Sequence, residues 1–158
     1  MGAAVKTELK HGQLPLSLGD TSKRDVRTQF AALCYRRVKS KTKVLPITSR
    51  DTGRWGLPKG WPMDDLTPVE TAMTEAWEEA GIRGTADLGC VGIYSYDEEL
   101  DTGTVLAVVV AVFSMPAGSI ADTYREAGER VRKWVSPKKA ARLVDEPDLA
   151  VLLRGFKP

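Results

Sequence analysis

The apolar and polar positions of the chain alternate in a way that predicts two β-hairpins. Residues 29–37 and 43–48 are short apolar segments separated by a polar stretch, which is typical of a hairpin. Residues 86–96 and 104–115 are rich in β-branched and aromatic side chains and flank an acidic turn, so they predict a second, longer hairpin. The alternation in residues 130–135 predicts one further strand.

Between the two hairpins, the sequence carries the start and stop signals of an α-helix. Thr67 is a suitable N-cap, Pro68 suits the first helical position, and Glu70 completes a capping box. Gly81 supplies the stop, because glycine readily adopts the left-handed conformation that ends many helices. An apolar stripe at helical spacing is formed by Val69, Ala72, Met73, Ala76 and Ala80. The helix is therefore predicted to be amphipathic and to pack on a core.

Two short helices are predicted near the end of the chain, at residues 138–144 and 148–153. Strands on both sides of one helix, followed by terminal helices, favour an α+β fold arranged as an α/β/α sandwich with a mixed sheet. Residues 1–26 lack clear periodicity and are expected to form a partly ordered tail. Residues 27–158 are expected to form a single domain.

Length and composition narrow the class of protein. A chain of 158 residues with 42% hydrophobic residues fits one globular domain. Its longest apolar run, Val105–Phe113, has nine residues, whereas a membrane-spanning helix needs about 20, so no membrane span is expected. Residues 1–10 lack the apolar core of a secretory signal. Cys34 and Cys90 are interpreted as reduced, buried thiols of a cytoplasmic protein, and the single His11 gives no support for a structural zinc site.

The charges are segregated, although the formal net charge is only +2. Up to Gly60 there are 13 basic and 4 acidic residues, whereas residues 61–101 carry 11 acidic residues and the single basic residue Arg83. A block of acid beside the basic segment disfavours binding to duplex nucleic acid, which is itself an anion. The distribution instead predicts a site where both signs of charge are needed.

Three carboxylates of the predicted helix share one face. At about 100° per residue, Glu75, Glu78 and Glu79 fall within an arc of about 100°. Like charges at this spacing repel one another, and no basic residue lies between Lys59 and Arg83 to offset them. A divalent cation such as Mg²⁺ would compensate the repulsion, because such ions prefer carboxylate oxygens. From the residues alone, a metal site and a solvated acidic face both remain open.

The segment Gly60–Ile82 resembles the Nudix box, whose pattern is G-x5-E-x7-R-E-U-x-E-E-x-G-U with U a bulky apolar residue. The order of the flanking elements is also similar, with one hairpin before the box and a longer one after it. The resemblance implies the Nudix fold, a mixed β-sheet between helices. Within that superfamily, the segment from Arg54 to Gly60 is similar to the branch that hydrolyses diphosphoinositol polyphosphates and dinucleoside polyphosphates.

The resemblance also implies an activity, namely hydrolysis of a diphosphate linkage with Mg²⁺ or Mn²⁺. Glu75 and Glu79 match the principal metal ligands of the family, and Glu78 matches a further ligand or an acid that orders water. The backbone at Gly60 matches a carbonyl ligand. All three glutamates are catalytic candidates, and which of them acts as the general base stays open.

Two positions depart from the box. Leu66 stands where the pattern has its first glutamate, and Thr74 stands where it has arginine. In the family the arginine pairs with box carboxylates, so its loss predicts reduced activity or altered metal affinity. Glu70 is interpreted as a capping residue rather than as a substitute for the missing glutamate. A catalytically weak, Nudix-type ligand-binding protein is therefore kept as an alternative.

Basic and aromatic residues near the box are candidates for binding a phosphorylated small molecule. Arginine forks match phosphate oxygens and lysine acts as a point charge, although ordinary surface charge remains open for each residue singly. The substrate-binding candidates are Arg27, Arg50, Arg54, Lys59 and, for stacking on a base, Trp61.

The acidic turn of the second hairpin bears on the substrate. Residues 97–101 contain four acids, which would repel a highly phosphorylated inositol ring. A dinucleoside polyphosphate is therefore favoured, with a diphosphoinositol polyphosphate as the alternative. These acids could also supply a late metal ligand or form a solvated turn. The sequence leaves open whether the protein is a monomer or a homodimer.

Overall fold

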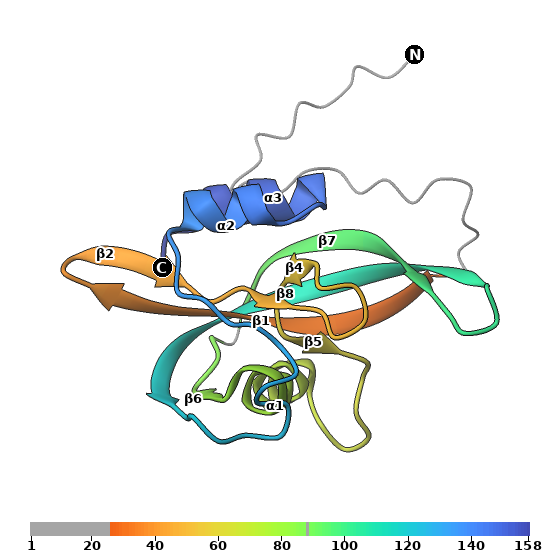
Figure 1. The fold of residues 1–158 in the computed structure, drawn as a ribbon, viewed down its shortest axis with the longest axis horizontal. Coiled ribbons are helices and arrows are strands. Elements are labelled where there is room, and N and C mark those ends of the chain that lie inside the picture. The colour runs from red at the N-terminus through yellow and green to blue at the C-terminus, as the bar shows by residue number, and fades with distance from the viewer. Residues whose placement is uncertain (1–25, 88) are drawn as a thin grey trace, which may run out of the picture.

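A computed structural model describes residues 26–87 and 89–158, and Figure 1 shows the arrangement of its helices and strands. The strands are β1 (Val26–Val38), β2 (Lys41–Val44), β3 (Ile47–Thr48), β4 (Trp55–Gly56), β5 (Lys59–Gly60), β6 (Ile82–Gly84), β7 (Cys90–Glu99) and β8 (Val105–Ile120). The helices are α1 (Pro68–Ala80), α2 (Pro137–Leu143) and α3 (Pro147–Arg154). The predicted tail falls outside the described residues, except that Val26 already belongs to β1.

Six strands form one mixed sheet. Along its main path the order is β2-β1-β8-β6, with β5 joined to β1 and β7 joined to β8. The central strands β1 and β8 run parallel, whereas every other pairing in this sheet is antiparallel. β3 and β4 form a separate two-stranded sheet. The two predicted hairpins are confirmed as β1–β2 and β7–β8.

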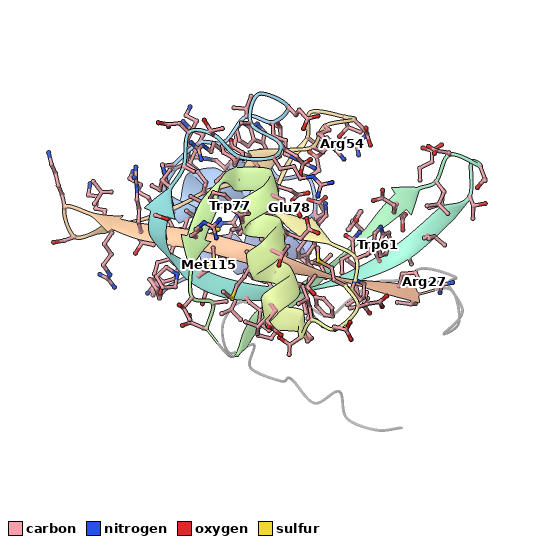
Figure 2. All side chains as sticks on the ribbon, turned by 90° about the horizontal axis from the view of Figure 1, so that it is seen from below. Arg27, Arg54, Trp61, Trp77, Glu78 and Met115 are labelled. Carbon is pink, nitrogen blue, oxygen red and sulfur yellow. The ribbon has the colours of Figure 1, made fainter. Side chains whose placement is uncertain are left out.

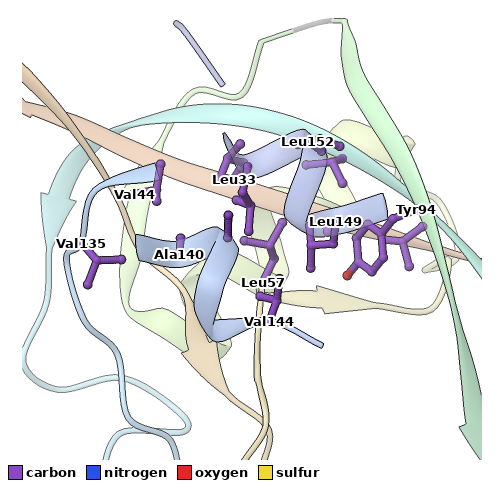
Figure 3. Packing of buried hydrophobic residues seen from close by; sticks show 14 of the residues in the cluster. Leu33, Val44, Leu57, Tyr94, Val135, Ala140, Val144, Leu149 and Leu152 are labelled. Atoms are coloured by element: carbon purple, nitrogen blue, oxygen red, sulfur yellow. The ribbon is translucent and has the colours of Figure 1, made fainter. Parts of the chain in front are cut away.

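Helices cover both faces of the sheet, which confirms the predicted α/β/α layers of an α+β fold (Figure 1). Successive side chains of a strand point to opposite faces. On β1, Leu33 accordingly packs with the cluster under α2 and α3, whereas Cys34 packs with the cluster under α1. Figure 3 shows the first cluster, in which Tyr94 of β7 lies against Leu149 of α3. Two hydrophobic cores therefore hold α1 on one face and the terminal helices on the other.

The signals read for α1 are confirmed at both ends. The Thr67 backbone N–H donates to Glu70 Oε1 at 2.9 Å, and the Glu70 N–H donates to Thr67 Oγ1 at 3.2 Å, which is the predicted capping box. Gly81 ends the helix with φ 68°, in the left-handed region. The stripe residues Ala72 and Ala76 are fully buried against the sheet. Local sequence thus fixes where the helix starts and which side it buries.

Three details differ from the sequence predictions. Residues 130–135 form no continuous strand and make only isolated bridges, from Val135 to Val44, from Arg132 to Ile47 and from Arg130 to Ala127. The short strand β6, paired with β8, was not predicted. Cys34 is buried as predicted, but Cys90 is exposed, because it opens β7 beside a register shift at the sheet's margin.

None of the helices in residues 26–87 and 89–158 has the length and apolar character needed to cross a membrane.

Candidate active site

The last two turns of α1 bring two box carboxylates against β5. The Lys59 backbone N–H donates to Glu79 Oε2 at 2.9 Å. A Cβ atom added to Gly60 would lie 2.2 Å from Glu75 Oε1, so only glycine lets this carboxylate approach the strand so closely. Lys59, Gly60, Glu75 and Glu79, all predicted site residues, are therefore neighbours in space.

The environment of these carboxylates opposes their ionisation. Burial raises the pKa of Glu75 to about 7, and the charges of Glu79, Glu78 and Glu126 add to the effect. Burial also raises the pKa of Glu79 to about 7, although Arg130 and the Lys59 N–H act in the opposite direction. Two carboxyl groups that titrate near neutral pH thus lie next to each other, which is typical of functional sites.

These pKa values predict how the stability of the metal-free protein depends on pH. The folded protein retains protons that the unfolded chain releases above about 4.5, so this contribution to stability is present at acidic pH. It is lost as the pH rises through about 7. We expect the melting temperature in chelator to fall between pH 5 and pH 8.

Thermal melts followed by circular dichroism across that range check this prediction. Glu75→Gln removes one of the two titrating groups, so its profile should be flatter than that of the wild type. A melting temperature that rises over the same range would contradict the prediction.

The residues at β5 fit a hard divalent cation. Glu75 and Glu79 offer carboxylate oxygens beside the Gly60 backbone, the kind of donor set that Mg²⁺ and Mn²⁺ accept. Among residues 26–87 and 89–158, however, no three acidic, histidine or cysteine side chains already converge as in a metal-bound cluster.

Glu78 contacts the segment that follows β8. Its Oε1 accepts a hydrogen bond from Arg125 at 3.1 Å, and its backbone carbonyl accepts one from the Glu126 N–H. Figure 2 shows Glu78 on the outer side of α1. Its role as a metal ligand or water-ordering acid stays a prediction.

The predicted phosphate-binding arginines occupy separate places. Arg50 pairs with Glu126 at 3.0 Å, and Arg54, which is largely exposed, lies 3.8 Å from Asp145. Arg27 lies at one end of the sheet, well away from Glu78 on α1 (Figure 2). Their roles in binding substrate stay predictions.

Lys59 and Trp61 lie next to Gly60 of the box. The Lys59 ammonium lies over the ring of Tyr96, 4.9 Å from its centroid, while the Lys59 backbone N–H faces α1. The Trp61 side chain follows directly in the loop, and the residue is 42% exposed. Lys59 therefore links the carboxylates of α1 to the surface formed by β7.

The sequence did not reveal two charged residues beside Glu79. Arg130 lies 2.9 Å from Glu79 and 3.2 Å from Glu126, and all three side chains are about nine-tenths buried. Both new residues belong to the segment after β8, far from the box in the chain. The only hint was the lack of a basic residue near the box acids, since a buried carboxylate needs a partner.

A polar cluster beyond Lys59 was also missed. The Tyr96 hydroxyl donates to Gln29 Oε1 at 2.5 Å. Glu146, at the start of α3, has a buried Oε2 without a hydrogen-bond partner, and burial raises its pKa. Residues of β1, β7 and α3 thus place hydrogen-bonding groups on the far side of Lys59 from α1.

Comparison with known proteins shows to which family a chain with this site belongs. A family model described as NUDIX domain matches residues 27–156, which is most of the chain. The chain belongs to the Nudix family. Box positions Glu75 and Glu79 of this Nudix protein are the ones that meet β5, whereas the departures Leu66 and Thr74 line a groove of about 330 Å³ on another side of α1.

Relatives of this Nudix protein include a "MutT-like protein" of Streptomyces ambofaciens, 30% identical over 69% of the chain and 65% of the relative. "Nudix hydrolase 13, mitochondrial" of Arabidopsis thaliana is 28% identical over 66% of the chain and 54% of the relative. The chain thus matches slightly less than two thirds of one relative and about half of the other. An Ap4A hydrolase of C. elegans has a similar fold, with a TM-score of 0.60 and 21% identity over 83% of this chain and 96% of that one.

Proposed function

We propose that this protein is a divalent-metal-dependent pyrophosphohydrolase. It cleaves the diphosphate linkage of a nucleoside diphosphate joined to another moiety. The observation that carries the proposal is the meeting of Glu75 and Glu79 with the Lys59–Gly60 strand. Membership of the Nudix family and the names of the two relatives support it.

The residues of the site have complementary tasks in this reaction. When bound, Mg²⁺ or Mn²⁺ supplies Lewis-acid stabilisation of the phosphate charge and makes water more acidic. Glu75 and Glu79 would hold the cation, with the Gly60 carbonyl as a further donor. A nearby box carboxylate would take the proton from the attacking water, and which of Glu75, Glu78 and Glu79 does so stays open. Lys59 provides positive charge for the substrate on the opposite side of the strand.

Dinucleoside polyphosphates are the favoured substrates. Tyr96 and Trp61 offer aromatic surfaces near Lys59 for the bases of such a substrate. Residues 97–101 continue β7 into an exposed acidic turn, which disfavours an inositol ring carrying many phosphates. The structurally similar C. elegans protein is named an Ap4A hydrolase, which points to the same class of substrate for testing.

Leu66 and Thr74 favour a second candidate, a Nudix protein that binds its ligand but turns it over weakly. Both residues replace charged positions of the box, and the groove that they line also contains the apolar side chains of Met73 and Trp77. A box without its own arginine has lost one partner for its acids. A binding protein of this kind would bind a nucleotide with normal affinity but hydrolyse it only slowly.

A substrate panel separates these candidates. We expect the protein with Mg²⁺ or Mn²⁺ to release nucleotides from diadenosine tetraphosphate faster than from ADP-ribose, a nucleotide sugar or a diphosphoinositol polyphosphate. Chromatography of the products measures each rate, and chelator should stop all of them. Turnover of the inositol compound alone would change the substrate class. Tight binding without turnover of any compound would replace the enzyme by the binding protein.

A further inference from the structure

The partner of Glu79 comes from outside its own helix. Glu79 is 7% exposed, and a buried carboxylate without partners is strongly unfavourable. Its Oε2 accepts the Lys59 backbone N–H, and its Oε1 accepts a hydrogen bond from an Arg130 terminal nitrogen at 2.9 Å. Among the described residues, Arg130 is thus the basic side chain that forms an ion pair with this carboxylate.

Arg130 is held in place by groups other than Glu79. Its second terminal nitrogen donates to the Thr48 carbonyl at 3.1 Å. Its Nε donates to Glu126 Oε1 at 3.3 Å, and the terminal nitrogen that contacts Glu79 also donates to Glu126 Oε1, at 3.2 Å. Glu126 in turn pairs with Arg50. The guanidinium is therefore anchored to Thr48 of β3 and to Glu126, which precedes Arg130 in the chain. It presents a fixed donor to Glu79.

The box position that normally supplies arginine cannot play this part. Thr74 has a short, uncharged side chain, so it cannot form an ion pair with a carboxylate. Its hydroxyl donates to the Glu70 carbonyl at 2.9 Å. We propose that Arg130 replaces the box arginine as the residue that positions Glu79 for metal binding. The inference rests on the proposed metal site, and it assigns Arg130 a positioning role, since it reaches the metal only through Glu79.

A competing role for Arg130 would have the opposite consequence. If Arg130 occupied the place of the cation, its removal would strengthen metal binding. The geometry favours positioning, because a carboxylate has about four lone-pair sites and Glu79 uses two of them here. Arg130 also has its own anchors at Glu126 and Thr48, so it need not leave when a cation arrives.

Mn²⁺ affinity without substrate separates the two roles. We expect Arg130→Gln to weaken Mn²⁺ binding, measured by electron paramagnetic resonance, by about 10-fold or more, the usual effect of losing a residue that orients a ligand. Arg130→Lys should recover part of the loss. Arg132→Gln is the matched control, because Arg132 bonds the backbone carbonyls of Ala80 and Ala121 and should leave the affinity unchanged. Unchanged or tighter binding by Arg130→Gln would overturn the proposal.

A second measurement tests the pairing in chelator, with neither metal nor turnover. Losing one member of a buried ion pair is strongly destabilising, so Arg130→Gln should lower the melting temperature by about 5 °C or more at pH 8. The same change made in a Glu79→Gln background should lower it much less. Equal shifts in both backgrounds would overturn the pairing. A wild type that binds no Mn²⁺ would instead contradict the proposed function, while this cycle still decides whether Arg130 and Glu79 act together.

Discussion

Replacing Glu79 with glutamine lowers the rate of diphosphate hydrolysis by about a thousandfold. The substitution preserves size and an acceptor for the Lys59 N–H, but it removes the charge that holds the cation. Charge stabilisation by a catalytic metal amounts to several kcal/mol, and about 4 kcal/mol corresponds to a factor of a thousand in rate. The measurement is kcat/KM for the best substrate of the panel at saturating Mg²⁺. A variant retaining a tenth of the wild-type rate would remove Glu79 from the metal site.

Glu70→Gln provides the control for this experiment on the same helix. Glu70 is exposed and belongs to the capping box, in which glutamine can replace glutamate, so the change removes one charge from the start of α1 without touching β5. Losing a favourable charge at a helix N-terminus costs about 0.3–1 kcal/mol of stability. We therefore expect nearly normal kcat/KM together with a slightly lower melting temperature. This pair of variants separates the chemistry of the acids from the stability of the helix that carries them.

Replacing Gly60 with alanine lowers kcat/KM by about a hundredfold while the fold persists. The added methyl group would lie 2.2 Å from Glu75 Oε1 and 2.5 Å from its carboxyl carbon, so the Glu75 side chain must move. That carboxylate is the end of a flexible side chain, and moving it costs the fold little. Displacement of a catalytic group by about 1 Å is enough for a hundredfold loss of rate. Activity and thermal melts of the same preparation test both halves of the prediction.

Gly56→Ala is the matched control for Gly60→Ala, because it makes the same substitution in another short strand. Gly56 lies in β4, and an added Cβ there would meet no atom within 4 Å. We expect this variant to keep both its activity and its melting temperature. If Gly60→Ala behaved in the same way, Glu75 would not need its close approach to β5.

The sequence predicted the elements whose signals are local. Thr67, Glu70 and Gly81 mark both ends of α1 within the helix itself, and the alternating apolar residues mark the long strands. β6 has only three residues, too few for a period to show. The segment 130–135 alternates like a strand, but only isolated bridges join it to β2 and β3. Its arginine side chains bond Thr48, Ala80 and Ala121 carbonyls instead.

The site was predictable to the extent that it follows from one motif. The spacing within the box matched Gly60, Glu75 and Glu79, and the structure brings all three together. Arg130 could not be found in this way, because its position beside Glu79 depends on how the chain returns from β8. Helical geometry grouped Glu78 with the other acids, but it could not reveal that Arg125 from the same returning segment pairs with Glu78. Ion pairs with residues distant in the sequence therefore determine the partners of the box acids, which the motif does not specify.

The parallel pairing of β1 with β8 has a consequence for biosynthesis. The two central strands lie far apart in the chain, and contacts of this kind slow folding because a long loop must close first. On the ribosome, β1 and α1 emerge before β8 and Arg130. Until β8 and Arg130 arrive, the apolar stripe of α1 lacks part of the core on which it packs, and Glu79 lacks its partner Arg130. Because exposed apolar surface makes incomplete chains prone to aggregate, we expect this interval of synthesis to be the most vulnerable one.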